Sequence, residues 1–163
     1  MKKQKLTLPA LDPLSVQAQT GSAYPNKFKA ICEAREKAKI GDVLGLTNFG
    51  VNLTRLRPGT ASSQRHWHDN QDEFIYVIEG ELVLVTDAGE QILTAGAVAG
   101  FPAGKADGHQ LINKSDHDAL YLEVGDRTPG GGAEYPDIDM RVKMTADGPR
   151  FTRKDGTPYG PDE

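Results

Sequence analysis

The sequence predicts one all-β domain, built as an antiparallel sandwich or barrel. Short apolar segments recur between residues 49 and 124, and no helical pattern separates them. The chain also contains 18 Gly and 10 Pro, enough to form the turns that many short strands need. A length of 163 residues suits a single domain with a sizeable core.

Composition excludes several classes of protein. Lys and Arg total 19 against 23 for Asp and Glu, and the net charge of -4 argues against a nucleic-acid partner. The single cysteine, Cys32, excludes an intrachain disulfide and fits a reducing compartment. The basic start is not followed by the apolar run of an export signal, and no stretch is long and apolar enough for a membrane helix. We therefore expect a cytoplasmic protein with no membrane partner.

The first part of the chain divides into an arm and an ambiguous segment. Residues 1–27 contain Pro and Gly with few regularly spaced apolar positions, which predicts an extended N-terminal arm. Residues 28–46 suit either a short helix or a strand. Because Phe28, Ala30 and Cys32 alternate, we favour a strand here, followed by a turn at residues 41–42.

The strand pattern is clearest after residue 48. Apolar residues alternate up to a turn at Pro58 and Gly59, and a longer apolar segment bends at Gly80. A short connection at residues 87–90 makes a hairpin. The expected strands are residues 49–53, 74–86 with its bend, 91–93, 97–101, 109–112 and 119–124.

Composition shifts again near the end of the chain. The glycines at 130–132 lack the spacing, the following helix and the lysine of a phosphate loop, so we interpret them as a plain linker. Residues 138–144 predict one more exposed strand, and the end from Asp147 is rich in turns. The expected organisation is an arm at 1–27, a barrel at 28–127 and a C-terminal extension at 128–163 packed on the barrel.

Three of the four histidines form a pattern that core packing does not require. His66 and His68 are one residue apart, so on a strand both imidazoles point to the same face. Glu73 opens an apolar strand, where an ionised carboxylate is costly unless it meets a cation. His109 opens a later strand and can join them across the interior. Imidazole nitrogens with one carboxylate oxygen suit a divalent transition ion better than Ca²⁺ or Mg²⁺.

The order of these residues extends over two motifs. The residues in question are Gly59, His66, His68, Glu73 and Gly80, followed by Gly96, Pro102, Gly104, His109 and Asn113. This order resembles the two motifs of the cupin superfamily, a glycine, His-x-His, a glutamate and a glycine, then a glycine, Pro-x-Gly, a histidine and an asparagine. The loops before His66 and His109 are longer than usual for that family.

The resemblance carries implications for fold and function. It implies a double-stranded β-helix, a jelly-roll-like antiparallel barrel, with His66, His68, Glu73 and His109 as ligands of one divalent transition ion, either Fe, Mn, Zn, Ni or Co. The whole chain is similar to compact bacterial one-domain cupins that are often named, by analogy, sugar-phosphate isomerases.

Basic residues near the ligand segments are candidates for binding an anionic substrate. They are Arg55, Arg57, Arg65 and Lys105. The competing interpretation is that each is a solvated surface charge, since the parity shared by the three arginines fits either face of a sheet. His117 and Trp67 are interpreted as a surface residue and a packing residue. No general base is assigned, because the nearest acidic residues, Glu79 and Glu81, more readily face solvent.

Three functions remain open at this point. The first is a metal-dependent cupin that acts on or binds a small, oxygenated, anionic metabolite, as a sugar-phosphate isomerase does. The second is an iron-dependent dioxygenase, and the third is a non-catalytic, metal-anchored binding module. Because an exposed sheet edge invites pairing, the N-terminal arm is expected to add to a neighbouring subunit and make a homodimer.

Overall fold

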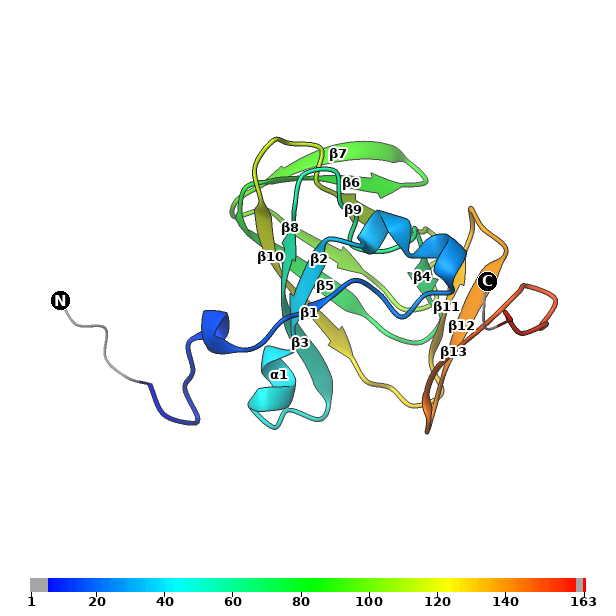
Figure 1. Ribbon diagram of the computed structural model, residues 1–163, viewed down its shortest axis with the longest axis horizontal. Coiled ribbons are helices and arrows are strands. Elements are labelled where there is room, and N and C mark those ends of the chain that lie inside the picture. Colours follow the sequence, from blue (N-terminus) through cyan, green and yellow to red (C-terminus); the bar gives the residue numbers. More distant parts are fainter. Residues whose placement is uncertain (1–5, 161–162) are drawn as a thin grey trace.

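The computed structural model describes residues 6–160 and 163, and strands dominate this part of the chain (Figure 1). The largest sheet has six strands, and all hydrogen-bonded neighbours in it run antiparallel. Its strands, in spatial order, are β1 (Gln19–Thr20), β2 (Arg35–Ala38), β3 (Phe49–Leu56), β10 (Ala119–Asp126), β5 (Glu73–Glu79) and β8 (Val98–Phe101).

A smaller sheet faces the first and closes the core between them. It contains β7 (Gly89–Thr94), β6 (Glu81–Thr86) and β9 (Gln110–Ile112). The chain passes from β5 to β6 through Gly80, whose φ is +79° and where a Cβ would lie 2.7 Å from the carbonyl oxygen of Asp118. Only glycine suits both demands. The buried core comprises Leu56, Ile75, Val77, Leu82, Leu84, Leu111, Ala119 and Tyr121.

The C-terminal extension forms a third sheet, and here two expectations were wrong. The order is β13 (Gly148–Thr152), β12 (Met140–Thr145), β11 (Gly132–Tyr135) and β4 (Trp67–His68). The glycines expected as a plain linker include the first residue of β11, and β13 lies in the stretch expected to be turns. A Cβ on Gly131 or Gly132 would lie 2.3 Å from an oxygen of Asn70 or Val142. These glycines therefore permit close approach between segments.

The ambiguous segment is mostly 3₁₀-helical before it becomes a strand. Two short 3₁₀-helices, η2 (Asn26–Phe28) and η3 (Ala30–Cys32), precede β2, and a four-residue helix, α1 (Ile40–Val43), follows it. The strand expected to begin at Phe28 begins at Arg35 instead. Phe28, Ile31 and Cys32 pack against a second core formed with Tyr24, Ala133, Tyr135 and Met140. A helical turn satisfies this packing because it brings residues three apart to one side.

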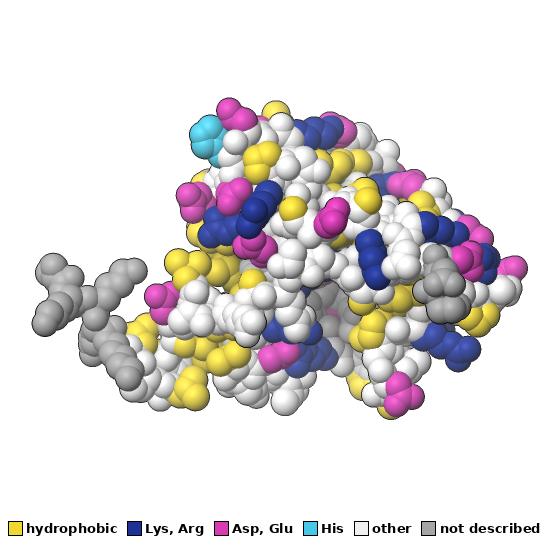
Figure 2. Space-filling model, in the orientation of Figure 1, with side chains coloured by type: hydrophobic (Ala, Val, Ile, Leu, Met, Phe, Trp, Pro, Cys, Tyr) yellow, Lys and Arg dark blue, Asp and Glu magenta, His cyan; other side chains and the backbone are white. Residues whose placement is uncertain are grey.

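The N-terminal segment leaves the body of the molecule (Figure 1). It includes the 3₁₀-helix η1 (Pro13–Ser15), and Leu8 and Leu14 are both exposed. Residues 19–20 pair with β2 of the same chain, so this part of the expected arm already belongs to the sheet. Apolar side chains gather where the segment departs, at the lower left of Figure 2. In residues 6–160, helices long and apolar enough to span a membrane are absent.

Candidate metal centre

The four predicted ligands come from three separate parts of the barrel. His68 ends β4, Glu73 opens β5, and His66 and His109 pair through an isolated antiparallel bridge. In that bridge the His66 amide donates to the His109 carbonyl at 3.1 Å, and the His109 amide donates to the His66 carbonyl at 2.8 Å. Backbone pairing therefore fixes the positions of the Cα atoms that carry these two imidazoles.

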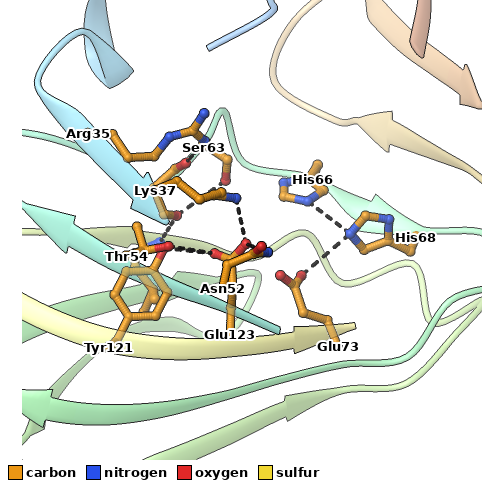
Figure 3. A network of polar contacts seen from close by, with 12 residues as sticks. Arg35, Lys37, Asn52, Thr54, Ser63, His66, His68, Glu73, Tyr121 and Glu123 are labelled. Atoms are coloured by element: carbon orange, nitrogen blue, oxygen red, sulfur yellow. Dashed lines mark hydrogen bonds and ion pairs between the residues drawn. The ribbon is translucent and has the colours of Figure 1, made fainter. Parts of the chain in front are cut away.

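The side chains converge on one point. One ligand atom from each of the four residues lies within 4.8 Å of all the others. His66 Nε2 is 3.2 Å from His68 Nε2, which is 3.4 Å from Glu73 Oε2 (Figure 3). Glu73 Oε2 is also 2.8 Å from His109 Nε2. Three imidazole nitrogens and one carboxylate oxygen match the donor preference of a divalent transition ion. The donor set therefore fits the metal that the sequence predicts.

Contacts behind the ligands hold the rings in place. His66 Nδ1 lies 2.9 Å from the Gln64 carbonyl oxygen, so a proton on Nδ1 leaves Nε2 free to face the centre. The His109 ring stacks on Phe101, with ring centroids 3.7 Å apart and planes within 7°. In the described part of the chain, His109 Nδ1 is buried without a hydrogen-bond partner, so the stacking on Phe101 and the contact of Nε2 with Glu73 orient this ring.

Burial and mutual charge set the protonation of the centre. Burial, with smaller contributions from His109 and His68, lowers the pKa of His66 to about 3. Burial also lowers the pKa of His68, but the hydrogen bond and charge of Glu73 outweigh it and raise that pKa overall. For Glu73, burial raises the pKa, yet its contacts with His109 and His68 hold it well below the usual value. At neutral pH a carboxylate and a neutral imidazole are thus already in place.

Three cavities adjoin the ligands. One of about 240 Å³ has all four ligands in its wall, together with Tyr24, Arg35, Lys37, Ser62, Ser63, Ile75, Phe101, Leu111, Tyr121 and Glu123. A second, of about 230 Å³, is lined by His68, His109, Trp67 and Lys105 among others. A third, of about 250 Å³, is lined by His68, Glu73, Asn52 and Glu123 among others. We call the first of these the ligand cavity.

A polar network occupies one side of the ligand cavity (Figure 3). Glu123, only 9 % exposed, accepts hydrogen bonds at one oxygen from Lys37 Nζ at 2.5 Å and from Asn52 Nδ2 at 2.9 Å. Its other oxygen accepts from the Tyr121 hydroxyl at 3.2 Å and the Thr54 hydroxyl at 3.4 Å. Burial raises the pKa of Tyr121 well above its usual value, and the Glu123 charge adds to this. Tyr121 therefore stays a hydrogen-bond donor.

The predicted basic residues lie elsewhere, apart from one. Of the four in the described chain, only Lys105 lines one of these three cavities. The carboxylate of Asp118 lies 3.3 Å from Arg55, and that of Glu36 lies 2.6 Å from Arg57. Alternation along β3 turns Thr54 and Leu56 inward, so Arg55 faces outward.

Arg65 is bound to two carboxylates rather than facing the ligands. It pairs with Asp87 and, at 2.6 Å, with Asp137. Among other residues weighed in the sequence, His117 is exposed beside Asp116, Trp67 lines the second cavity, and buried Asn113 donates to the Leu56 and His117 carbonyl oxygens.

Sequence reasoning missed the polar side of the ligand cavity, formed by Arg35, Lys37, Tyr121 and Glu123. One signal was present for Tyr121 and Glu123. They share a parity with Ala119 on an apolar strand, so a polar face should have been expected toward the interior. Arg35 and Lys37 fall in the segment whose secondary structure was ambiguous.

Comparisons with known proteins agree with this architecture. A family model described as a cupin domain matches residues 52–125. A crystal structure from Silicibacter pomeroyi, described as a sugar phosphate isomerase from a cupin superfamily, is 50% identical, with a TM-score of 0.90 over 95% of this chain and 99% of that one. A search of curated proteins returns no match.

More distant structures share the fold. A putative sugar phosphate isomerase from Acidithiobacillus ferrooxidans is 24% identical, with a TM-score of 0.70 over 78% of this chain and 81% of that chain. A predicted oxalate decarboxylase from Thermotoga maritima is 18% identical, with a TM-score of 0.59 over 73% of this chain and 99% of that chain. The two motifs, the barrel and the close relative lead to one conclusion: this chain belongs to the cupin superfamily.

Proposed function

We propose that the protein is a metal-dependent cupin that acts on a small, oxygenated, anionic metabolite, in the manner of a sugar-phosphate isomerase. The observation that carries the proposal is the convergence of His66, His68, Glu73 and His109 on one point in the wall of the ligand cavity. The 50% identity to a protein described as a sugar phosphate isomerase supports the substrate class.

The four ligands would hold one ion of Fe, Mn, Zn, Ni or Co. Such an ion supplies Lewis-acid chemistry, because it polarises a carbonyl or hydroxyl oxygen. A cavity of about 240 Å³ is smaller than the ~300 to 1,000 Å³ of pockets for drug-sized ligands, which suits a small metabolite. Ile75, Phe101 and Leu111 exclude water from its apolar side.

The polar side of the cavity can bind and orient such a substrate. Isomerisation of an aldose to a ketose moves a proton between adjacent carbons and requires the hydroxyl groups to be held in place. The Lys37 ammonium supplies donors to substrate oxygens there, and the Tyr121 hydroxyl, which donates its proton to Glu123, can accept a hydrogen bond from a substrate hydroxyl. Glu79 and Glu81, the acidic residues nearest the ligands in sequence, do not line the ligand cavity.

A dioxygenase-type cupin is the second candidate. It is favoured by the apolar residues beside the ligands, since activation of dioxygen requires little from the protein beyond iron and a dry cavity. A non-catalytic, metal-anchored binding module would share the same ligand set.

Metal analysis and turnover together test these functions. The protein is purified without added metal, its metal content is measured by elemental analysis, and it is then assayed with pentose and hexose phosphates, oxo acids and catechols. Turnover of a sugar phosphate that is lost with chelator supports the proposal. Iron with turnover of a catechol supports the dioxygenase. A thermal shift by one compound without turnover supports a binding module.

We also propose that the protein is a cytoplasmic homodimer. The free, buried Cys32 suits a reducing compartment. Phe74, Tyr76 and Ile78 alternate along β5 with their side chains exposed on one face of the sheet. A second copy of the chain would cover such an apolar face.

A further inference from the structure

We propose that Lys37, supported by Arg35, forms an anion subsite inside the ligand cavity and receives the phosphate group of the substrate. This inference rests on the proposed function, because it assigns a role to the second side of the same cavity. It assigns the binding of the anion to Lys37 and Arg35, which no sequence motif identified, and not to the arginines predicted from the sequence.

The position of Lys37 is the first observation. Its side chain extends from β2 toward Glu123, and His66, His68 and Glu73 lie beyond it in the same view (Figure 3). Both Lys37 and the four ligands line the ligand cavity. A substrate held by the ion at one end can therefore meet the ammonium group at the other.

Lys37 also has donors to spare. An ammonium group has three N–H donors, and the one hydrogen bond found for Nζ among the described residues goes to Glu123. The side chain is 24 % exposed and lines the ligand cavity. Two donors thus remain for oxygens of a ligand.

Glu123 positions Lys37 rather than reacting itself. A carboxylate has about four acceptor sites. Lys37 and Asn52 share one oxygen of Glu123, and Tyr121 and Thr54 share the other. With every site engaged, Glu123 has no free acceptor for a substrate proton, but it holds the ammonium group at a fixed place.

Arg35 adds a second positive charge to the same wall. Its guanidinium donates to two neutral carbonyl oxygens, those of Ser62 at 2.5 Å and Gly21 at 2.6 Å. Within residues 6–160 and 163 it forms no ion pair, and its Nε is buried without a hydrogen-bond partner. Its charge is therefore not compensated locally, in contrast to Arg55, Arg57 and Arg65.

The charge balance of the cavity predicts the ligand. Its wall contains two cations, Arg35 and Lys37, and two carboxylates, Glu73 and Glu123, which cancel. A divalent ion bound by the four ligands would leave two positive charges uncompensated in a partly buried space. Buried charges require compensation. A phosphate monoester, with about two negative charges near neutral pH, restores the balance better than a neutral sugar does.

The test measures binding of inorganic phosphate to zinc-loaded protein by calorimetry. The variants are Lys37→Met, Lys37→Arg and the double variant Lys37→Met with Glu123→Gln, which removes both charges of the pair. We expect Lys37→Met to weaken phosphate binding roughly 10- to 100-fold, the loss of a hydrogen bond between charged groups. Lys37→Arg should restore part of the affinity. If Lys37→Met does not fold because Glu123 is left unpaired, the double variant removes both charges and allows the same measurement of phosphate affinity.

Controls separate this inference from the proposed function. Lys114→Met removes a lysine that is paired with Glu90 on the surface, and it should leave phosphate binding unchanged. Zinc content is measured on every sample. Protein that does not retain zinc contradicts the metal-dependent function. The subsite is overturned if the protein has full zinc occupancy but does not bind phosphate, or if the Lys37 variants bind phosphate as tightly as the unmodified protein. It is also overturned if Lys105→Met, and not Lys37→Met, weakens phosphate binding.

Discussion

The guanidinium of Arg65 donates two hydrogen bonds to the carboxylate of Asp137, each 2.6 Å long. One partner precedes the first metal ligand, and the other lies between β11 and β12. The pair therefore joins the C-terminal extension to the strand segment that carries His66. The side chain of Arg65 is 15 % exposed, so this contact is more constrained than an ordinary surface ion pair.

Replacing Arg65 with Met should destabilise the protein without affecting anion binding. We expect a loss of about 1 kcal/mol in the free energy of unfolding, near the upper end for exposed pairs, because Asp137 is 56 % exposed. Urea unfolding measures the loss. Arg57→Met, which removes a more exposed pair, is the matched control and should change less. Unchanged stability together with weaker phosphate binding would instead make Arg65 a substrate ligand.

Removing a single ligand should remove the metal. We expect His68→Ala and His109→Ala to retain little divalent ion after dialysis, because each deletes one of four donors. Elemental analysis after dialysis measures the effect, with His117→Ala as the control, since His117 is exposed beside Asp116 and takes no part in the centre. Full occupancy in either ligand variant would contradict the assignment.

Metal affinity should fall in acid. The pKa of His68 is raised by Glu73 against the effect of burial, so below that pKa a proton competes with the ion for His68. His66, with a pKa of about 3, does not compete above that pH. Affinity should thus fall as the pH drops through the His68 pKa, by about tenfold per pH unit for each proton that the ion displaces. Chelator competition over a pH series measures this, and an affinity independent of pH between 5 and 8 would refute it.

The bend between β5 and β6 should tolerate only glycine. Ala at position 80 would require a left-handed backbone conformation and would place its Cβ 2.7 Å from the Asp118 carbonyl oxygen. Gly45→Ala is the control, because Gly45 has a similar φ of +73° but no atom within 4 Å of the added Cβ. We expect Gly80→Ala to cost about 1 to 3 kcal/mol more than the control in thermal or urea unfolding. Equal losses of stability in Gly80→Ala and Gly45→Ala would mean that the backbone moves enough to relieve the contact between the added Cβ and the Asp118 carbonyl oxygen.

The N-terminal segment should contribute to dimerisation. Because β1 and Tyr24 belong to the folded body, the informative deletion is residues 1–12, which leaves both in place. We expect this deletion to lower the dimer fraction in sedimentation. A second variant, Tyr76→Glu, places a charge on the exposed face of β5 and tests that face separately. A dimer unaffected by both changes would contradict the proposed interface.

The ligands and the central strands were accessible to sequence reasoning because their signals are local. His66 and His68 lie two residues apart, and the apolar run from 74 to 86 shows its bend at Gly80. The polar side of the cavity is not local. Lys37 reaches Glu123 only because β2 pairs with β3 and β3 with β10, so that both Lys37 and Tyr121 lie opposite Thr54. Pairing registers of that kind are not visible in composition or periodicity.

The position of β11 was missed for a related reason. Its first residue, Gly132, has neither an apolar nor a β-branched side chain, and three successive glycines are typical of a flexible connection. The requirement for glycine comes from Asn70, which lies far away in the sequence and approaches Gly131, and from the Val142 carbonyl on the paired strand β12, which approaches Gly132. The sequence pattern could not reveal such neighbours.

The pairing of β4 with β11 has a consequence for biosynthesis. Trp67 and His68 lie opposite Glu134 and Ala133, and in the described residues β11 is the sheet neighbour of β4. During translation, Glu73 and His109 are synthesised before β11, the strand that pairs with β4 and supports His68. The nascent barrel would therefore hold His68 through the amide of Gly104 but without its sheet partner, and the metal centre would be complete only after β11 has emerged.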